Sequence, residues 1–166
     1  MNVITSNNAE LFYKALEDVW VAEQTWFGSP NIAVWHCTQA IEKTMKGFLR
    51  CLNVDYDLGH ELDLLLDVIL TYFEIPKEMS QHILYFNAFK NKLRYRNMAN
   101  DPSPEDAKLA ISRTKQIMQG FNSNPKIKKF MDEARDVYMK ILNANQEKYG
   151  EKIIEDSSRL QKVRVE

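Results

Sequence analysis

Five polar side chains recur every three or four residues between His36 and Arg50. The row consists of His36, Gln39, Lys43, Lys46 and Arg50, with successive spacings of 3, 4, 3 and 4. Side chains at these spacings share one narrow face of an α-helix. Three of the five are cationic and no acid interrupts the row, so this face could bind a phosphate or another anion. A solvated helix face is the alternative interpretation, and periodicity alone favours it.

A second basic segment, residues 90–96, has the sequence KNKLRYR. It carries four cations and no acid, and Tyr85, Phe89 and Tyr95 interleave with it. Cations beside aromatic rings are what a nucleotide or single-stranded RNA surface needs. The alternative is a set of core aromatics whose neighbouring cations lay their aliphatic stems along apolar surface.

The sequence gives little support for a metal site or a glycine-rich phosphate-binding loop. The three histidines have neither the spacing of a zinc site nor a Glu three residues before them, as a di-iron bundle requires. The chain lacks a P-loop and a G-x-G-x-x-G turn. We therefore expect no metal and no cofactor.

The two cysteines are expected to be free thiols. Cys37 and Cys51 stand 14 residues apart, which is about 21 Å along one helix and too far for a disulfide. Cys37 falls on an apolar stripe, where it is expected to pack and not to act as a nucleophile. Free thiols suit a reducing cytoplasm.

Composition indicates an ordinary globular domain. The 166 residues are 45% hydrophobic and 27% charged, with a formal net charge of −1, so any anion binding must come from a local patch. The longest apolar run is interrupted by Asp67 and is too short for a membrane helix. The first ten residues lack the pattern of a signal peptide, and we expect a cytoplasmic protein without membrane partners.

Helical periodicity dominates the chain, and no segment alternates convincingly at period two. Ser29 and Ser103, each followed by proline, are predicted to cap helices, and Gly150 is predicted to interrupt the last one. The expected helices cover approximately residues 8–27, 30–52, 60–73, 77–95, 104–121 and 125–149. The fold class is therefore all-α, an antiparallel bundle of four to six helices.

Two regions are expected within this single domain. Residues 1–122 form the bundle, and residues 123–166 add a C-terminal helix and a charged tail packed on it. The buried face of the second helix is predicted to contain Ala33, Cys37, Ala40, Ile41, Thr44 and Phe48. The aromatic residues of the fourth helix and the apolar stripe of the sixth exceed what a small bundle needs, which suggests a homodimer.

The segment from Trp35 to Ile69 resembles the signature of HEPN domains, helical domains associated with nucleotide binding. Gln39, Ala40, Glu42, Lys43 and Lys46 match its Q-A-x-E-K-x-x-K element. His60 and Leu62, with Leu65 or Leu66, match a following H-x-L-x-x-L element. Arg94 and Tyr95 match the start of an R-Y-P element, in which Arg96 replaces the proline. The resemblance covers about Ala9 to Thr114.

The resemblance implies a bundle of four or five helices that usually pairs as a homodimer. Some family members are metal-independent ribonucleases, often toxins, and others accompany a small nucleotidyltransferase. The nuclease members carry Arg, a polar residue and a His after four to six intervening positions. Counting from Arg96 or Arg94, the positions for this His hold Ala, Asn, Asp, Pro or Ser. A general acid or base is therefore missing where the family places it, and no catalytic residue is predicted.

The preferred hypothesis is non-catalytic binding of a nucleotide or RNA, with a nucleotidyltransferase as a possible partner. The alternatives are a ribonuclease with a displaced active site and a purely structural dimerisation module. Lys43 is expected to be an exposed charge, so its replacement should leave the melting temperature nearly unchanged. The phosphate contacts would come from Lys43, Lys46, Arg50, Arg94 and Arg96. Gln39, His60 and Tyr95 would orient or stack the ligand.

Overall fold

The computed structural model describes the backbone of residues 7–55, 59–94 and 101–163, and the side chains of 8–55, 59–87, 89 and 101–148. These residues form six helices and no strand. The helices are α1 (Asn7–Thr25), α2 (Pro30–Cys51), α3 (Leu62–Tyr72), α4 (Lys77–Arg94), α5 (Pro104–Asn122) and α6 (Pro125–Val163). The predicted all-α class is confirmed. None of the described helices combines the length and the apolar character required to cross a lipid bilayer.

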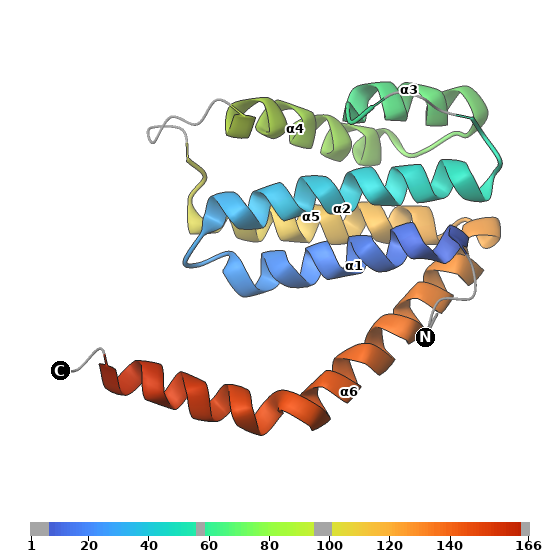
Figure 1. Ribbon diagram of the computed structural model, residues 1–166. Helices are drawn as coiled ribbons and strands as arrows, with labels where there is room; N and C mark the ends of the chain where they lie inside the picture. Colours follow the sequence, from blue (N-terminus) through green and yellow to red (C-terminus); the bar gives the residue numbers. More distant parts are fainter. Residues whose placement is uncertain (1–6, 56–58, 95–100, 164–166) are drawn as a thin grey trace.

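The second helix is the centre of the bundle. It contacts all five other helices, with α3 and α4 on one side, α1 on the other and α5 behind it (Figure 1). Twelve of its 22 residues are buried, which a helix with only one covered side could not achieve. The predicted face from Ala33 to Phe48 is confirmed, since all six of its residues are at most 2% exposed. Phe48 also packs against the rings of Phe73 and Phe121, with centroids 5.1 and 4.9 Å away.

Two predicted helix boundaries are wrong. The third helix begins at Leu62 and not at His60, because the chain turns at Gly59, whose φ is +60°, and Glu61 is still extended. A left-handed φ of this kind favours glycine and cannot belong to an α-helix. The sixth helix continues through Gly150, which costs only about 1 kcal/mol relative to alanine within a helix.

The first turns of α6 pack on the bundle. Ile127, Met131 and Ala134 are buried, and the ring of Tyr138 meets that of Tyr13 edge to face at 5.9 Å. Residues 143–148 are exposed, and the later part of α6 lies apart from the bundle (Figure 1). The assignment of residues 123–166 to the same domain stays a prediction.

The apolar side chains that suggested a homodimer pack against other residues of the same chain. Phe86 of α4 is fully buried, and Tyr85 and Phe89 pack against the same core. The apolar stripe of α6 covers part of α1. These surfaces therefore no longer argue for pairing, and the dimer stays a prediction.

Candidate functional site

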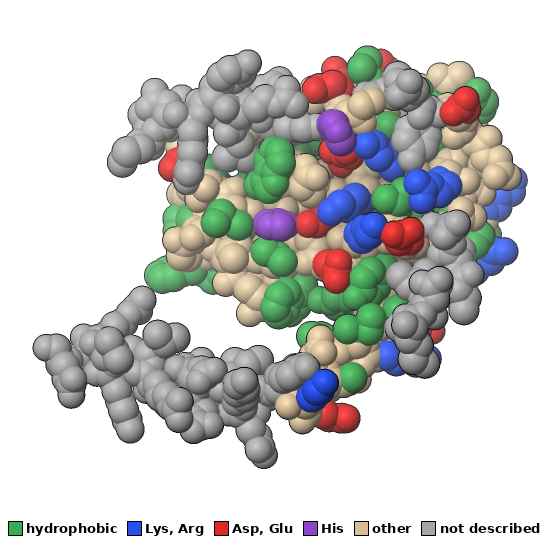
Figure 2. Space-filling view, in the orientation of Figure 1, with side chains coloured by type: hydrophobic (Ala, Val, Ile, Leu, Met, Phe, Trp, Pro, Cys, Tyr) green, Lys and Arg blue, Asp and Glu red, His purple; other side chains and the backbone are tan. Residues whose placement is uncertain are grey.

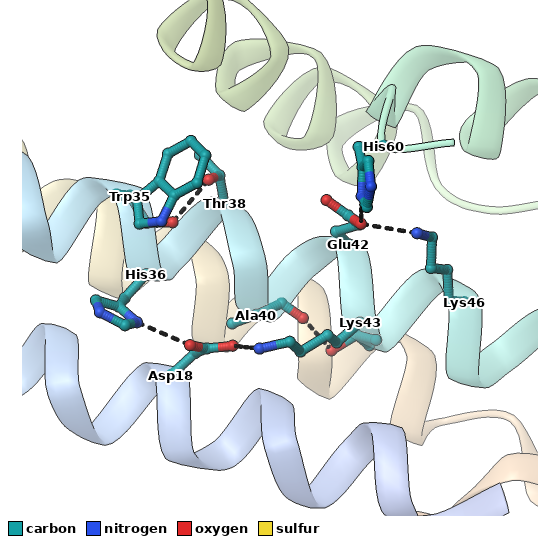
Figure 3. A network of polar contacts seen from close by, with 10 residues as sticks. Asp18, Trp35, His36, Thr38, Ala40, Glu42, Lys43, Lys46 and His60 are labelled. Carbon is teal, nitrogen blue, oxygen red and sulfur yellow. Dashed lines mark hydrogen bonds and ion pairs between the residues drawn. The ribbon is translucent and has the colours of Figure 1, made fainter. Parts of the chain in front are cut away.

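One half of the polar row on α2 is organised by an acid from the neighbouring helix. Asp18 of α1 has a side chain only 9% exposed, and it lies between His36 and Lys43 (Figure 3). One carboxylate oxygen is 2.8 Å from Nδ1 of His36, and the other accepts a hydrogen bond from Nζ of Lys43. A buried carboxylate needs such partners, since an uncompensated charge is costly away from water. The expectation that Lys43 is an exposed charge is therefore wrong, since its side chain is 28% exposed and paired. The effect of its replacement on stability stays a prediction.

The other half is organised by Glu42, which lies on α2 itself and is only 4% exposed. Its Oε1 atom accepts a hydrogen bond from Nζ of Lys46 at 2.8 Å, the pairing that their spacing predicts. Nδ1 of His60, in the turn before α3, lies 2.6 Å from the same oxygen. Because a carboxylate only accepts, the His60 ring donates from Nδ1, and Nε2 is the basic nitrogen of its neutral form. The imidazole is 71% exposed and so reaches solvent.

The row is consequently split between two sides of α2. His36 and Lys43 turn toward α1. Lys46 turns toward α3, where it meets Glu42 and His60, two residues outside the row (Figure 3). Cations and acids lie interspersed over this face (Figure 2). The lysine side chains are 28% and 17% exposed, so their ammonium groups are held near the surface in fixed positions. Arg50 is exposed and Gln39 is half-buried.

The remaining predicted contacts lie at the end of α4. Tyr95 and Arg96 fall outside the described residues, as does the side chain of Arg94. The hypothesis of one phosphate surface requires α2 and α4 to be neighbours, and they are in contact. Whether Arg94, Tyr95 and Arg96 converge with the α2 row stays a prediction.

In a comparison with protein families, residues 9–124 match the HEPN domain. This match covers most of the chain and includes α1 to α5. The chain belongs to the HEPN family. No curated protein and no solved structure matches it significantly.

The cysteines of this HEPN domain are unsuited to nucleophilic chemistry. Burial raises the pKa of the Cys37 thiol to about 11, against a smaller lowering by its hydrogen bond with Thr114. Burial also raises the pKa of Cys51 to about 11, although Arg50 and Lys129 act in the opposite direction. The thiolate is the reactive form, so a raised pKa makes both residues weak nucleophiles near neutral pH. Both are free thiols, as the sequence predicted.

The residue that sequence reasoning missed in the HEPN bundle is Asp18. A signal was present, since it occupies a helical position between Ala15, Val19 and Ala22, all of which are buried. An acid on an apolar face is rarely left without a partner. His36 and Lys43, two turns apart along the packed α2 helix, could have been identified as its partners on that basis.

Proposed function

We propose that this HEPN protein binds the phosphate groups of a nucleotide or RNA on the α2 face, without catalysing a reaction. One observation supports the proposal: each of two buried carboxylates holds a lysine and a histidine at the surface of α2. An ammonium group has three donors, so a lysine bound to one carboxylate can also donate to a phosphate oxygen. Side chains already held in position lose less conformational entropy when the ligand binds.

The ligand contacts would concentrate on the side of α2 that faces α3. Lys46 and His60 share Glu42 there, and the exposed Arg50 lies one turn after Lys46. The acids reduce the net charge of the face, so binding should be modest and sensitive to salt.

The test compares ATP and a short single-stranded RNA as ligands of the parent protein and of single variants. Arg50→Ala and His60→Ala should weaken binding and reduce its salt dependence by about one unit per lost phosphate contact. Lys128→Ala is the matched control, because this lysine is 58% exposed, lies on α6 and pairs with Asp132 rather than with Asp18 or Glu42. Equal binding by Arg50→Ala, His60→Ala and the parent would end the proposal. Arg50→Ala is the deciding variant. Replacing His60 or Lys43 also removes a partner of a buried carboxylate, Glu42 or Asp18.

Ribonuclease activity is the second candidate, and the His60–Glu42 contact favours it. A carboxylate that binds Nδ1 orients an imidazole so that Nε2 can exchange protons with a substrate, as in other catalytic His–acid pairs. Lys46 on the same carboxylate could stabilise charge on a phosphate. Cleavage of labelled RNA in the presence of EDTA that is lost in His60→Ala would support this alternative. RNA binding without cleavage would support the binding function instead.

We further propose a cytoplasmic homodimer, with a nucleotidyltransferase as partner. Pairing is supported by large apolar side chains exposed near the connected ends of α1 and α2. They are Trp20, Phe27, Ile32 and Trp35, with exposed fractions of 40 to 75%. Large apolar side chains that stay exposed near one another are typical of interaction surfaces. Light scattering should report a dimer at micromolar concentration, and Trp35→Glu should make it monomeric.

A further inference from the structure

A cavity lies between α1, α5 and the first turns of α6, away from the polar face of α2. Its volume is about 410 Å³. Phe12, Leu16 and Val19 line it from α1, Met118 from α5 and Met131 from α6. Small-molecule sites typically have volumes of about 300–1,000 Å³ and mostly apolar walls. The cavity therefore has the size and the lining of a site for a small molecule.

The third wall belongs to α6, which begins at Pro125 and thus follows the residues that match the HEPN family. Met131 is only 5% exposed and Phe12 only 1%, so the floor of the cavity is well packed. The unbranched side chains of Met118 and Met131 can adapt to the shape of an apolar ligand.

Two cations from different helices stand at the cavity. Lys115 of α5 pairs with Glu23, and Arg135 of α6 lies 3.6 Å from Asp132. Both side chains are more than half exposed, at 55% and 54%. Each has more N–H donors than its acidic partner uses, since ammonium has three and guanidinium five. The mouth of the cavity can therefore accept an anionic group while its floor holds an apolar one.

A buried acceptor completes the site. Within the described part of the chain, Oδ1 of Asn122 is buried and accepts no hydrogen bond. Asn122 lines the same cavity. A buried acceptor without a donor is destabilising. Because Oδ1 has almost no accessible surface, the Asn122 amide must turn toward the cavity before a ligand N–H or O–H group can donate to it, and that hydrogen bond would then recover part of the lost free energy.

We propose that this cavity binds a small amphipathic carboxylic acid that also carries a hydrogen-bond donor. The apolar body lies against Phe12, Met118 and Met131, and the carboxylate lies at Lys115 and Arg135. The amide or hydroxyl hydrogen of the ligand is donated to Asn122. The site does not depend on nucleotide or RNA binding by the α2 face.

The test uses three related probes in calorimetric titrations of the full chain. N-octanoylglycine has an apolar chain, an amide N–H and a carboxylate, its methyl ester lacks the carboxylate, and N-octanoylsarcosine lacks the N–H. We expect N-octanoylglycine to bind at one site and each of the other two to bind about tenfold more weakly, the loss of one charged or buried hydrogen bond. Absence of N-octanoylglycine binding at about 1 mM, or equal affinity for the acid and its ester, would overturn the proposal.

Variants locate the site. Arg135→Ala should weaken N-octanoylglycine binding about tenfold while changing affinity for the ester little. Lys140→Ala is the matched control, because it removes an exposed cation from the same helix at a position that does not line the cavity. Equal affinity of Arg135→Ala and the parent for the acid would contradict the proposal. Both variants change exposed residues, so both should fold.

Discussion

The Nδ1 atom of His36 on α2 lies 2.8 Å from the carboxylate of Asp18 on α1. Lys43, two turns further along α2, binds the other oxygen of the same carboxylate. Asp18 therefore joins two helices through a charged group that is almost withdrawn from water, with a side chain 9% exposed. Removing one partner of such a group is costly, whereas removing an exposed ion pair is not.

Lys43→Ala should lower the free energy of unfolding by about 1–3 kcal/mol, because Asp18 then loses one of the two partners it has among the described residues. Urea unfolding monitored by circular dichroism measures the change. Lys128→Ala removes an ammonium from an ion pair whose members are 58% and 38% exposed, and it should cost at most about 0.5 kcal/mol. Equal losses in the two variants would show that burial of Asp18 does not matter.

Two serine caps provide a second comparison. Ser103 accepts a hydrogen bond from the backbone N–H of Asp106, whose carboxylate accepts one from the backbone N–H of Ser103. Ser29 occupies the same position before α2 but makes no side-chain cap bond. Ser103→Ala should therefore cost about 1 kcal/mol in unfolding free energy, and Ser29→Ala nearly nothing. Thermal unfolding that ranks the two variants in the opposite order would contradict this assignment.

The fold was predictable because its determinants are local. Apolar residues at helical spacing, the Ser103–Pro104 start and the few glycines define six helices without reference to contacts between them. The failures also have local causes. His60 lies outside α3 because the left-handed Gly59 starts a turn, and Gly150 lies inside α6 because the cost of one helical glycine is small.

The candidate site was less predictable because it depends on two helices. The row of cations on α2 is visible in the sequence, as is the spacing of Glu42 and Lys46. The position of Asp18 against His36 and Lys43 depends on how α1 packs on α2, which no spacing within one helix specifies. The net positive charge of a face, when it is inferred from the sequence of one helix, is therefore an upper limit, since neighbouring helices can supply acids.

Gly47 permits the close approach of α2 to α1. A Cβ atom at this position would lie 2.8 Å from Cε1 of Phe12, whose ring is 1% exposed. Gly47→Ala should therefore destabilise the protein by about 1–3 kcal/mol, despite the better helix propensity of alanine. Gly120→Ala is the matched helical control, because its Cβ would meet the flexible thioether of Met79. We expect the lower midpoint of urea unfolding for Gly47→Ala, and a lower midpoint for Gly120→Ala would refute the argument.

The free energy of unfolding should fall at alkaline pH, because the Cys37 thiol is buried. Burial raises its pKa from the ordinary 9.0 to about 11 in the folded chain. Between these two values the unfolded thiol loses its proton while the folded thiol retains it. The unfolded state then binds fewer protons, so the free energy of unfolding falls as pH rises. The contribution is fully present below pH 9.0 and lost by about pH 11, and its upper limit is about 3 kcal/mol, since each tenfold change in acidity corresponds to about 1.4 kcal/mol.

Cys37→Ala should reduce the alkaline loss, which urea unfolding measures over the same pH range. Cys51→Ala should do the same, since burial raises the pKa of that thiol to about 11 as well. The two sites are about 21 Å apart along α2, so their effects should add in the double variant. Tyr138, whose pKa burial raises to about 12, should leave a residual slope at the highest pH. A Cys37→Ala curve parallel to that of the parent would show that the thiol does not ionise differently in the folded and unfolded states.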